Sequence, residues 1–524
     1  MVFDVLIKGG CVIDGTGNAW FKADVAVERG RISEVGRLGS ASAERVIDAT
    51  GLVVCPGFID IHAHGAVGLL VEPRAECLLR QGITTFVAGN CGMSVAPIKC
   101  QGRVNRMVDG WGIDPDWSTF KEFFGRLERQ GMAINLASLV GNGTVRRCVI
   151  GVEDRKPTKD EVEEMKSYVA EAMEDGAVGL SSGLYYVPSL YADTEELVEL
   201  CKVVARYRGF YATHYRNLGH LQFEAVKEAI EIGERAGVPV QLSHLMSGFY
   251  LRGKDPELLR LVEEARERGV DVTADTLAYN IGPWGSHTLI PTWGIEGSVE
   301  RLLERLRNPE IRERIKQDTR THADRTGGSF KRALAQMERW DRFWVWDPEH
   351  LRGKSLEEVA ELRGMVDPYD AYLDIILEEE GRVGGQADEG GQEDLDYNMA
   401  HPFCMPATDS GLGRTSNPRD YGTFARVLGW YVRDRGIVFL EEAIRKSTSL
   451  PAQKLGFRDR GLLREGMWAD IVIFNPRTVR DKGSRERPHE YPEGIPYVLV
   501  NGRVVVDNAE HTGDMPGRAL RHRT

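Results

Sequence analysis

A His-x-His pair stands at the end of a short, mostly apolar segment, residues 57–64. Alternate side chains of a β-strand point to the same face, so we expect His62 and His64 to project together. Two convergent imidazoles are typical of a metal site. A single pair also occurs as two unrelated surface histidines, so the rest of the chain has to decide between these interpretations.

Four other apolar segments also end in chemically active side chains: Cys91, His214, His244 and Asp409. Thiolate and imidazole are preferred zinc ligands, and a carboxylate can act as a general acid or base. If these segments are parallel strands of one barrel, their ends meet at the face where barrel active sites lie. Each residue alone is compatible with a capping, core or turn role. The whole set predicts a metal-dependent active site.

The middle of the chain alternates short apolar runs with amphipathic helical patterns, which is typical of a parallel α/β architecture. Eight runs are expected to be strands: 58–64, 84–91, 134–140, 177–182, 210–215, 239–244, 271–277 and 403–408. Helical periodicity lies between most of them, for example at 159–175, 194–208, 222–236 and 255–268. The count of eight favours a TIM-like (β/α)8 barrel over a doubly wound sheet.

Both ends of the chain predict β structure, with a hairpin closed near Gly30 at one end and strands at 469–474 and 497–506 at the other. Neither end is long enough to close a sandwich alone. We therefore expect residues 1–56 and 455–524 to pair into one small β-sandwich domain. The hydrolase barrel, residues 57–454, is then inserted between them.

One interval, at about 285–400, interrupts the alternation of strands and helices and predicts an insertion. Helical patterns occur within it at 298–306, 356–361 and 369–379. Residues 381–396 are rich in Gly, Gln and acids, and predict a mobile loop. The insertion is expected to be either a lid at the mouth of the barrel or a decoration.

Composition limits the function classes. The 524 residues are 42% hydrophobic and 28% charged, as in a soluble globular protein of more than one domain. The net charge of -12 argues against nucleic-acid binding, and no apolar run is long enough to span a membrane. The first ten residues lack the layout of a signal peptide, and the eight cysteines are scattered. We expect reduced thiols and a cytoplasmic location.

Five stretches resemble the N-acyl-D-amino-acid deacylases (D-aminoacylases) of the amidohydrolase superfamily: 51–64, 82–92, 176–184, 211–216 and 422–429. The Gly-Asn-Cys-Gly motif that ends at Gly92 is the most specific of these stretches. The resemblance runs nearly from end to end and is weakest in the insertion. It implies zinc-dependent hydrolysis of N-acyl-D-amino acids to a D-amino acid and a carboxylate.

The resemblance also implies a role for each candidate residue. Cys91, His214 and His244 would hold one zinc ion tightly. His62 and His64 would form a second, weaker metal position, or His64 would help to orient the substrate. Asp409 would be the catalytic acid/base. The family holds the substrate carboxylate with an arginine and a tyrosine, and the matching positions are Arg419 and Tyr279.

The chemistry of these side chains agrees with amide hydrolysis. Zinc lowers the pKa of bound water to about 7 and polarises the carbonyl. Asp409 can take the proton of the water and pass it to the leaving nitrogen. Arg419 suits a carboxylate, because a guanidinium can bind both of its oxygens. His220 and His401 are interpreted as structural or loop residues.

Four departures from the family pattern put the substrate in doubt. Gly65 and Ala66 follow the His-x-His pair where the family often has two acids, Asn142 replaces a histidine, Met246 replaces a lysine, and Asn417 replaces a second histidine. An amidohydrolase that acts on a cyclic imide, a ureide or another amide is therefore an alternative. A metal-free scaffold protein is a third hypothesis, against which the metal-ligand set argues. The sequence does not determine the oligomeric state.

Overall fold

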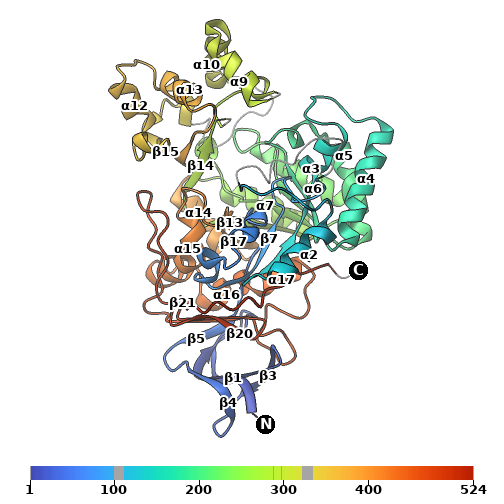
Figure 1. Cartoon of the computed structure of the whole chain (residues 1–524), viewed down its shortest axis with the longest axis vertical. Coiled ribbons are helices and arrows are strands. Elements are labelled where there is room, and N and C mark those ends of the chain that lie inside the picture. The colour runs from blue at the N-terminus through green and yellow to red at the C-terminus, as the bar shows by residue number, and fades with distance from the viewer. Residues whose placement is uncertain (1, 99–110, 287, 297, 322–333, 523–524) are drawn as a thin grey trace.

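The structure is a computed structural model that describes residues 2–98, 111–286, 288–296, 298–321 and 334–522. Three parts follow one another along the long axis in Figure 1. A β domain that contains the N-terminus lies at the bottom, a barrel of strands and helices lies in the middle, and a small module lies at the top. The cavity described below is lined by residues of the barrel and of the module.

Strands from both ends of the chain form the β domain. The N-terminal part contributes β1 (Val2–Val12), β2 (Phe21–Glu28), β3 (Arg31–Gly36), β4 (Ser42–Asp48) and β5 (Val53–Pro56). The C-terminal part contributes β18 (Ile471–Phe474), β19 (Tyr497–Val500), β20 (Arg503–Asp507) and β21 (Glu510–His511). Antiparallel pairing of β18 with β5 joins the two parts into one nine-stranded sheet. The expected β-sandwich from both chain ends is confirmed, whereas the domain boundaries at 57 and 454 stay a prediction.

Local sequence explains the first hairpin of the β domain. Arg29 and Gly30 connect β2 to β3, with Glu28 paired to Arg31. Their φ angles are 52° and 79°, and a two-residue turn with positive φ at both positions matches the twist of the flanking strands. The expected hairpin near Gly30 is confirmed.

Eight parallel segments form the barrel wall in the described part of the chain, and each corresponds to an expected strand. They are β6 (Phe58–Asp60), β7 (Ile83–Ala88), β8 with β9 (Asn135–Ser138, Val140–Gly141), β10 (Gly179–Gly183), β11 (Phe210–His214), β12 (Val240–Leu242), β13 (Val272–Leu277) and β17 (Cys404–Ala407). A parallel bridge between Ala63 and Ser410 joins the first segment to the last. Val178 N–H donates to Ser138 O and joins β8 to the segment before β10. The predicted barrel is confirmed.

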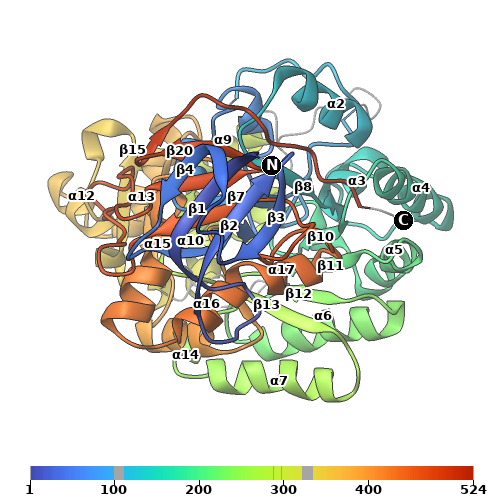
Figure 2. The same cartoon turned by 90° about the horizontal axis from the view of Figure 1, so that it is seen from below.

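Amphipathic helices cover the barrel, and Figure 2 shows α4–α7 along its periphery. The first half contains α1 (Glu76–Leu79), α2 (Phe120–Gln130), α3 (Asn142–Val149), α4 (Lys159–Glu174), α5 (Thr194–Arg206), α6 (Gln222–Ala236) and α7 (Asp255–Glu267). The second half contains α14 (Gln392–Ala400), α15 (Arg419–Arg426), a π-helix (Val427–Asp434), α16 (Leu440–Ser447) and α17 (Ser449–Lys454). Thr158 and Glu161 form a capping box at the start of α4, and left-handed Gly237 ends α6.

The expected insertion contains a separately packed module. Strands β14 (Ile281–Gly285), β16 (Gly384–Asp388) and β15 (Phe343–Asp347) pair in that order in an antiparallel sheet. The helices are α8 (Thr292–Ile295), α9 (Val299–Arg307), α10 (Pro309–Arg320), α12 (Leu356–Leu362) and α13 (Pro368–Glu378). The module has its own apolar core, which includes Trp284, Phe343 and Tyr372. The three expected helices are confirmed, and residues 287, 297 and 322–333 of the insertion lie outside the described residues.

The expectation of a mobile loop at residues 381–396 is wrong, because this stretch contains β16 and the start of α14. Its glycines allow close packing. A Cβ on Gly385 would lie 2.1 Å from Trp344 O and 2.4 Å from Cε2 of Trp284. Trp284 Nε1 in turn donates to Gln386 O at 3.0 Å. Trp284, whose ring packs on β16, belongs to β14. The composition of residues 381–396 therefore gives no sign that they form a strand.

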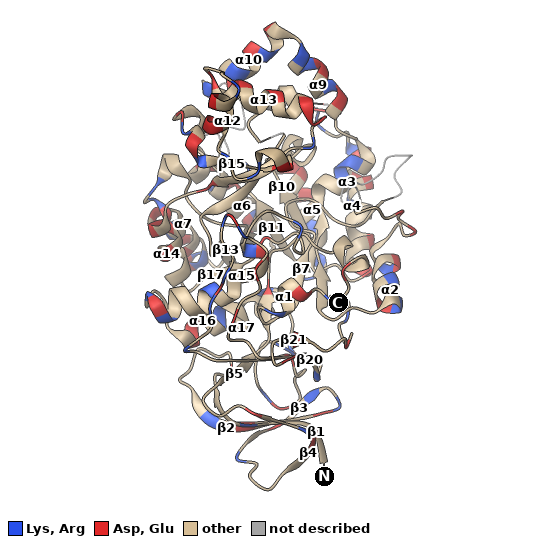
Figure 3. Cartoon of the chain, turned by 60° about the vertical axis from the view of Figure 1, so that its left-hand side comes forward, with Lys and Arg blue, Asp and Glu red and all other residues tan. Residues whose placement is uncertain are grey.

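Positively and negatively charged residues are interspersed along the outer helices in the view of Figure 3. No helix within the described ranges has the length and apolar character needed to cross a membrane. Six cysteines are free thiols: Cys11, Cys55, Cys77, Cys91, Cys201 and Cys404. Cys148 is disulfide-bonded, so the expectation of reduced thiols is wrong for this residue.

Candidate metal centre and active site

A thiol and three imidazoles meet at the carboxyl-terminal end of the barrel strands. Cys91 Sγ lies 3.4 Å from His62 Nε2 and 3.9 Å from His244 Nε2. Donor atoms of these three buried side chains all lie within 4.8 Å of one another. His214 is adjacent, with Nδ1 3.8 Å from the same sulfur. The fold thus brings together four side chains that the sequence predicted on four separate strands.

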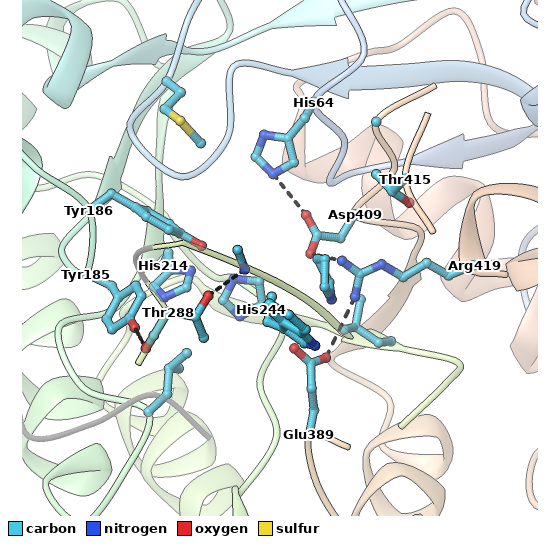
Figure 4. A pocket seen from close by; sticks show the side chains of 17 residues that line it. His64, Tyr185, Tyr186, His214, His244, Thr288, Glu389, Asp409, Thr415 and Arg419 are labelled. Atoms are coloured by element: carbon cyan, nitrogen blue, oxygen red, sulfur yellow. Dashed lines mark hydrogen bonds and ion pairs between the residues drawn. The ribbon is translucent and has the colours of Figure 1, made fainter. Parts of the chain in front are cut away.

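A second cluster shares His62 and extends toward the cavity. Asp409 Oδ1 lies 2.9 Å from His64 Nε2 and 3.5 Å from His62 Nε2. The other carboxylate oxygen, Oδ2, accepts a hydrogen bond from Arg419 Nη2 at 2.7 Å. Figure 4 shows Asp409 between His64 and Arg419. Asp409 therefore connects the histidine pair to the expected carboxylate-binding arginine.

Asp275, on β13, fixes two of the histidines. Its Oδ1 lies 3.1 Å from His62 Nδ1 and accepts the backbone N–H of His244 at 2.7 Å. Its Oδ2 accepts from Gln241 Nε2 at 2.9 Å. An outer carboxylate of this kind orients a metal-binding histidine and sets which nitrogen faces the ion. Asp275 is not among the site residues expected from the sequence, although a charged residue in an otherwise buried strand is a usable signal.

The buried cluster changes the protonation of its members. Burial raises the pKa of the Cys91 thiol, but His62, His214 and His244 outweigh burial and hold it well below its usual value. Burial and the neighbouring His244 lower the pKa of His214 to about 4. Burial opposes ionisation of Asp409, yet Arg419 and the histidine pair hold its pKa well below its usual value. A thiolate, a neutral imidazole and a carboxylate are the forms in which Cys91, His214 and Asp409 bind metals and accept protons. Burial lowers the pKa of His62 and His64, but Asp275 and Cys91 raise that of His62, and Asp409 and Cys91 raise that of His64 to about 9.

Three site residues stand on left-handed backbone. The φ angles are 52° for Cys91, 38° for His244 and 49° for Asp409. Non-glycine residues in sparsely populated regions cost on the order of 1–3 kcal/mol each, and such residues cluster at functional sites. Gly89, which opens the Cys91 turn, has φ +78°, and a Cβ there would lie 2.1 Å from Leu139 O. The strand ends therefore bend sharply and aim their side chains at one point.

A cavity of about 440 Å³ opens over the two clusters. Its polar floor consists of His64, His214, His244, Asp409 and Arg419. One wall comes from barrel loops and contains Met93, Tyr185, Tyr186 and Leu218. The module provides the other wall, with Pro283, Trp284, Gly285, Thr288 and Glu389. The Tyr185 hydroxyl donates to Thr288 O at 3.1 Å, so the two walls are in contact.

Tyr279 is absent from the cavity lining among the described residues, so the expectation that it binds the substrate carboxylate is not supported by this arrangement. Its hydroxyl donates to Asp481 Oδ2 at 2.8 Å, and the Arg426 guanidinium lies over its ring at 4.6 Å. His401 Nε2 lies 3.2 Å from Glu263 Oε1, and the His220 ring contacts that of Tyr250. Neither His401 nor His220 is among the described residues that line the cavity.

None of the residues behind the four departures from the family pattern lines the described cavity, and Asn142 and Met246 show what they contact instead. Asn142 is fully buried; its Oδ1 accepts a hydrogen bond from Ser189, and its Nδ2 lies 3.5 Å from Glu196 Oε1. Met246 is 1% exposed, and its carbonyl accepts from Gln222 Nε2 at 2.8 Å. These substitutions therefore alter the packing around the site, and the cavity surface itself is built by other residues.

Three residues that line the cavity were not expected from the sequence: Tyr185, Tyr186 and Glu389. The two tyrosines directly follow β10, so the strand-end argument that found His214 applies to them as well. Glu389 follows β16, within the stretch expected to be mobile. Its Oε2 lies 3.8 Å from Arg419 Nη1, and no local pattern relates these two residues.

The chain is similar over nearly its whole length to known amidohydrolases. The amidohydrolase family model matches residues 45–506. The D-aminoacylase of Alcaligenes xylosoxydans xylosoxydans is 34% identical over 99% of this chain and 97% of its own. The chain belongs to the D-aminoacylase family of amidohydrolases. The chain is a metal-dependent amidohydrolase.

Solved structures of this amidohydrolase family agree with the assignment. The N-acyl-D-glutamate deacylase of Bordetella bronchiseptica, solved with zinc and a phosphonate that mimics the tetrahedral intermediate, superposes with a TM-score of 0.84. It is 32% identical and covers 99% of this chain and 100% of its own. A D-aminoacylase described as having a binuclear metal centre, with one-metal activation and second-metal attenuation, gives a TM-score of 0.81 at 33% identity, with 99% and 100% coverage. Zinc is thus bound in a relative of the same architecture.

The residues of this amidohydrolase fit a zinc ion. A Cys91 thiolate with the imidazoles of His62, His214 and His244 is a nitrogen and sulfur donor set of the kind zinc prefers. Within the described ranges, His214 Nε2 and His64 Nδ1 are buried without a hydrogen-bond partner. The opposite nitrogens, His214 Nδ1 and His64 Nε2, face Cys91 and Asp409. Buried polar atoms are rarely left without a partner, so the orphaned nitrogens are available to a bound ligand or water.

Proposed function

We propose that this protein is a zinc-dependent N-acyl-D-amino-acid deacylase that releases a D-amino acid and a carboxylate. The observation that carries the proposal is that Asp409, Arg419 and two histidines in contact with Cys91 line one cavity; the histidines are His214 and His244. The family relationship supports the substrate class, because relatives at 32–34% identity are a D-aminoacylase and an N-acyl-D-glutamate deacylase.

Metal ligation is proposed at two positions. Cys91, His214 and His244 would hold the tight zinc ion, with His62 beside the same sulfur. His62, His64 and Asp409 would form the weaker position, since their donor atoms also lie within 4.8 Å of one another. When bound, zinc supplies a Lewis acid and lowers the pKa of water.

Asp409 is proposed as the proton carrier of the reaction. Its carboxylate faces the cavity and is held in the ionised form by Arg419. It would accept the proton of the attacking water and deliver it to the leaving amide nitrogen. His64, 2.9 Å from Asp409 Oδ1, would hold the carboxylate in place during both transfers.

Arg419 is proposed to bind the substrate carboxylate. Only Nη2 donates to Asp409, and Nε and Nη1 are buried without a hydrogen-bond partner in the part of the chain that the structure describes. Nη1 and Nη2 together form one edge of the guanidinium, and such an edge suits the two oxygens of a carboxylate. We expect Arg419→Lys to raise KM at least about tenfold and to lower kcat less, because a lysine keeps the charge but loses the two-point contact. Steady-state kinetics on N-acetyl-D-leucine measure this split, and an unchanged KM would contradict the role.

Tyr186 is proposed to donate a hydrogen bond to the developing oxyanion. It lines the cavity, its ring meets that of His214 edge to face at 4.9 Å, and burial holds the pKa of its hydroxyl well above the usual value. We expect Tyr186→Phe to lower kcat about 100-fold with zinc still bound, as for loss of one oxyanion donor. Tyr185→Phe is the matched control, because its hydroxyl already donates to the Thr288 carbonyl. Equal losses in both variants would argue against a special role for Tyr186.

The substrate class is tested with paired N-acetyl-D- and N-acetyl-L-amino acids and zinc-loaded protein. Selective release of D-amino acids is the expected result. Hydrolysis of neither series would redirect the search to cyclic imides and ureides, the alternative that the sequence departures raised. None of the residues behind the four departures lines the described cavity, so all four reasons for that alternative lose weight.

A further inference from the structure

The relatives leave the preferred amino-acid side chain open, because a D-aminoacylase and an N-acyl-D-glutamate deacylase are about equally similar to this chain. We propose that Glu389 makes this cavity select uncharged D-side chains and reject those that carry a carboxylate. This inference rests on the proposed deacylase function and adds the substrate subclass to it.

The position of the Glu389 carboxylate is built into the module. Glu389 is 6% exposed, and its backbone N–H donates to Asn280 O at 2.8 Å. A Cβ on Gly282 would lie 1.8 Å from Glu389 Oε1. The carboxylate of Glu389 therefore fits against β14 only because residue 282 is a glycine. Figure 4 shows Glu389 pointing toward Arg419 from the module side. Glu389 therefore presents a fixed negative charge in the module wall.

The positive charge available to a substrate is limited. Arg419 is the only lysine or arginine among the described residues that line the cavity. Asp409 and Glu389 already lie 2.7 Å and 3.8 Å from its Nη2 and Nη1. The α-carboxylate of an N-acyl-amino acid would use the remaining donors of this arginine. An acidic substrate brings a second carboxylate, for which the described lining offers no further arginine or lysine.

A side-chain carboxylate would therefore be desolvated beside Glu389 with no further lysine or arginine as counter-ion in the described lining, where His64 already faces Asp409. Burial of an unpaired charge is costly, and like charges in a site of low dielectric repel strongly. Uncharged side chains meet no such penalty, because Met93, Leu218 and Trp284 give the walls an apolar surface. The same cavity thus discriminates by charge and tolerates apolar bulk.

N-acetyl-D-glutamine and N-acetyl-D-glutamate provide a test in which shape is constant and only the charge differs. We expect the wild-type protein with zinc to show kcat/KM at least about 100-fold higher for the glutamine substrate, since like-charge juxtaposition is strongly unfavourable. Glu389→Gln should reduce this ratio to about tenfold or less, because the fixed charge is gone while the side-chain shape is kept. Glu349→Gln, an exposed position in the same module, is the matched control and should leave the ratio unchanged.

Three results would overturn the inference. They are similar wild-type rates on both substrates, an unchanged ratio in Glu389→Gln, and hydrolysis of N-acetyl-D-leucine with no hydrolysis of either glutamine or glutamate substrate. If Glu389→Gln is inactive, Met93→Lys decides, because a cation in the opposite wall should lower the ratio as well. Failure to hydrolyse any N-acetyl-D-amino acid would instead refute the proposed function on which the inference rests.

Discussion

An Asp409→Asn variant is expected to retain its tightly bound zinc and to lose about 10⁴-fold in kcat, the upper range for one general acid–base group. Asparagine has the same shape and can still contact His64 and Arg419, but it cannot carry a proton between water and the leaving nitrogen. The measurement combines zinc content by elemental analysis with turnover of N-acetyl-D-leucine. Turnover within about tenfold of the parent would show that another group moves the proton.

In the Asp409→Asn variant, Arg419 is expected to stay in place. Arg419 Nη2 donates to Asp409 Oδ2, and an asparagine oxygen can accept the same bond. KM for the substrate should therefore change less than kcat, as expected when an interaction of the transition state is removed. Asp347→Asn, at a position in the module whose side chain is 59% exposed, is a suitable control for the loss of one carboxylate.

Replacing Cys91 with alanine is expected to lower zinc affinity at least about 100-fold, because loss of an outer ligand partner alone costs 10–100-fold. The sulfur lies within 3.9 Å of nitrogen atoms of three histidines, so its removal leaves three imidazoles without their common neighbour. Turnover should fall with zinc content, and added zinc should restore part of it. Titration with a competing chelator gives the affinity.

Cys201→Ala provides the matched control for this second variant. Cys201 is also buried, but it lies on α5 and does not line the described cavity. Its replacement should leave zinc content and turnover close to those of the parent. Full zinc content and full turnover in Cys91→Ala would mean that the histidines and Asp409 alone form the metal site.

The sequence by itself determined the barrel and the types of the metal ligands. Short apolar runs and helical periodicity are local signals, and their alternation predicted each barrel strand, including those that end in Cys91 and Asp409. Because the strands of a parallel barrel share one direction, residues at their carboxyl ends had to converge. Gly89 adopts positive φ, which glycine allows without strain, so the turn at this position follows from the local sequence.

Only the tertiary structure decided which side chains support and surround these ligands. Asp275 reaches His62, Glu389 reaches Arg419, and Tyr279 turns to Asp481 through contacts between residues far apart in the chain. Within the stretch 381–396, β16 is ordered because Trp284 from β14 packs on its glycines. Such pairings depend on the relative placement of whole elements. Local periodicity fixes the type and face of an element, and its neighbours are set only when the core and the module pack.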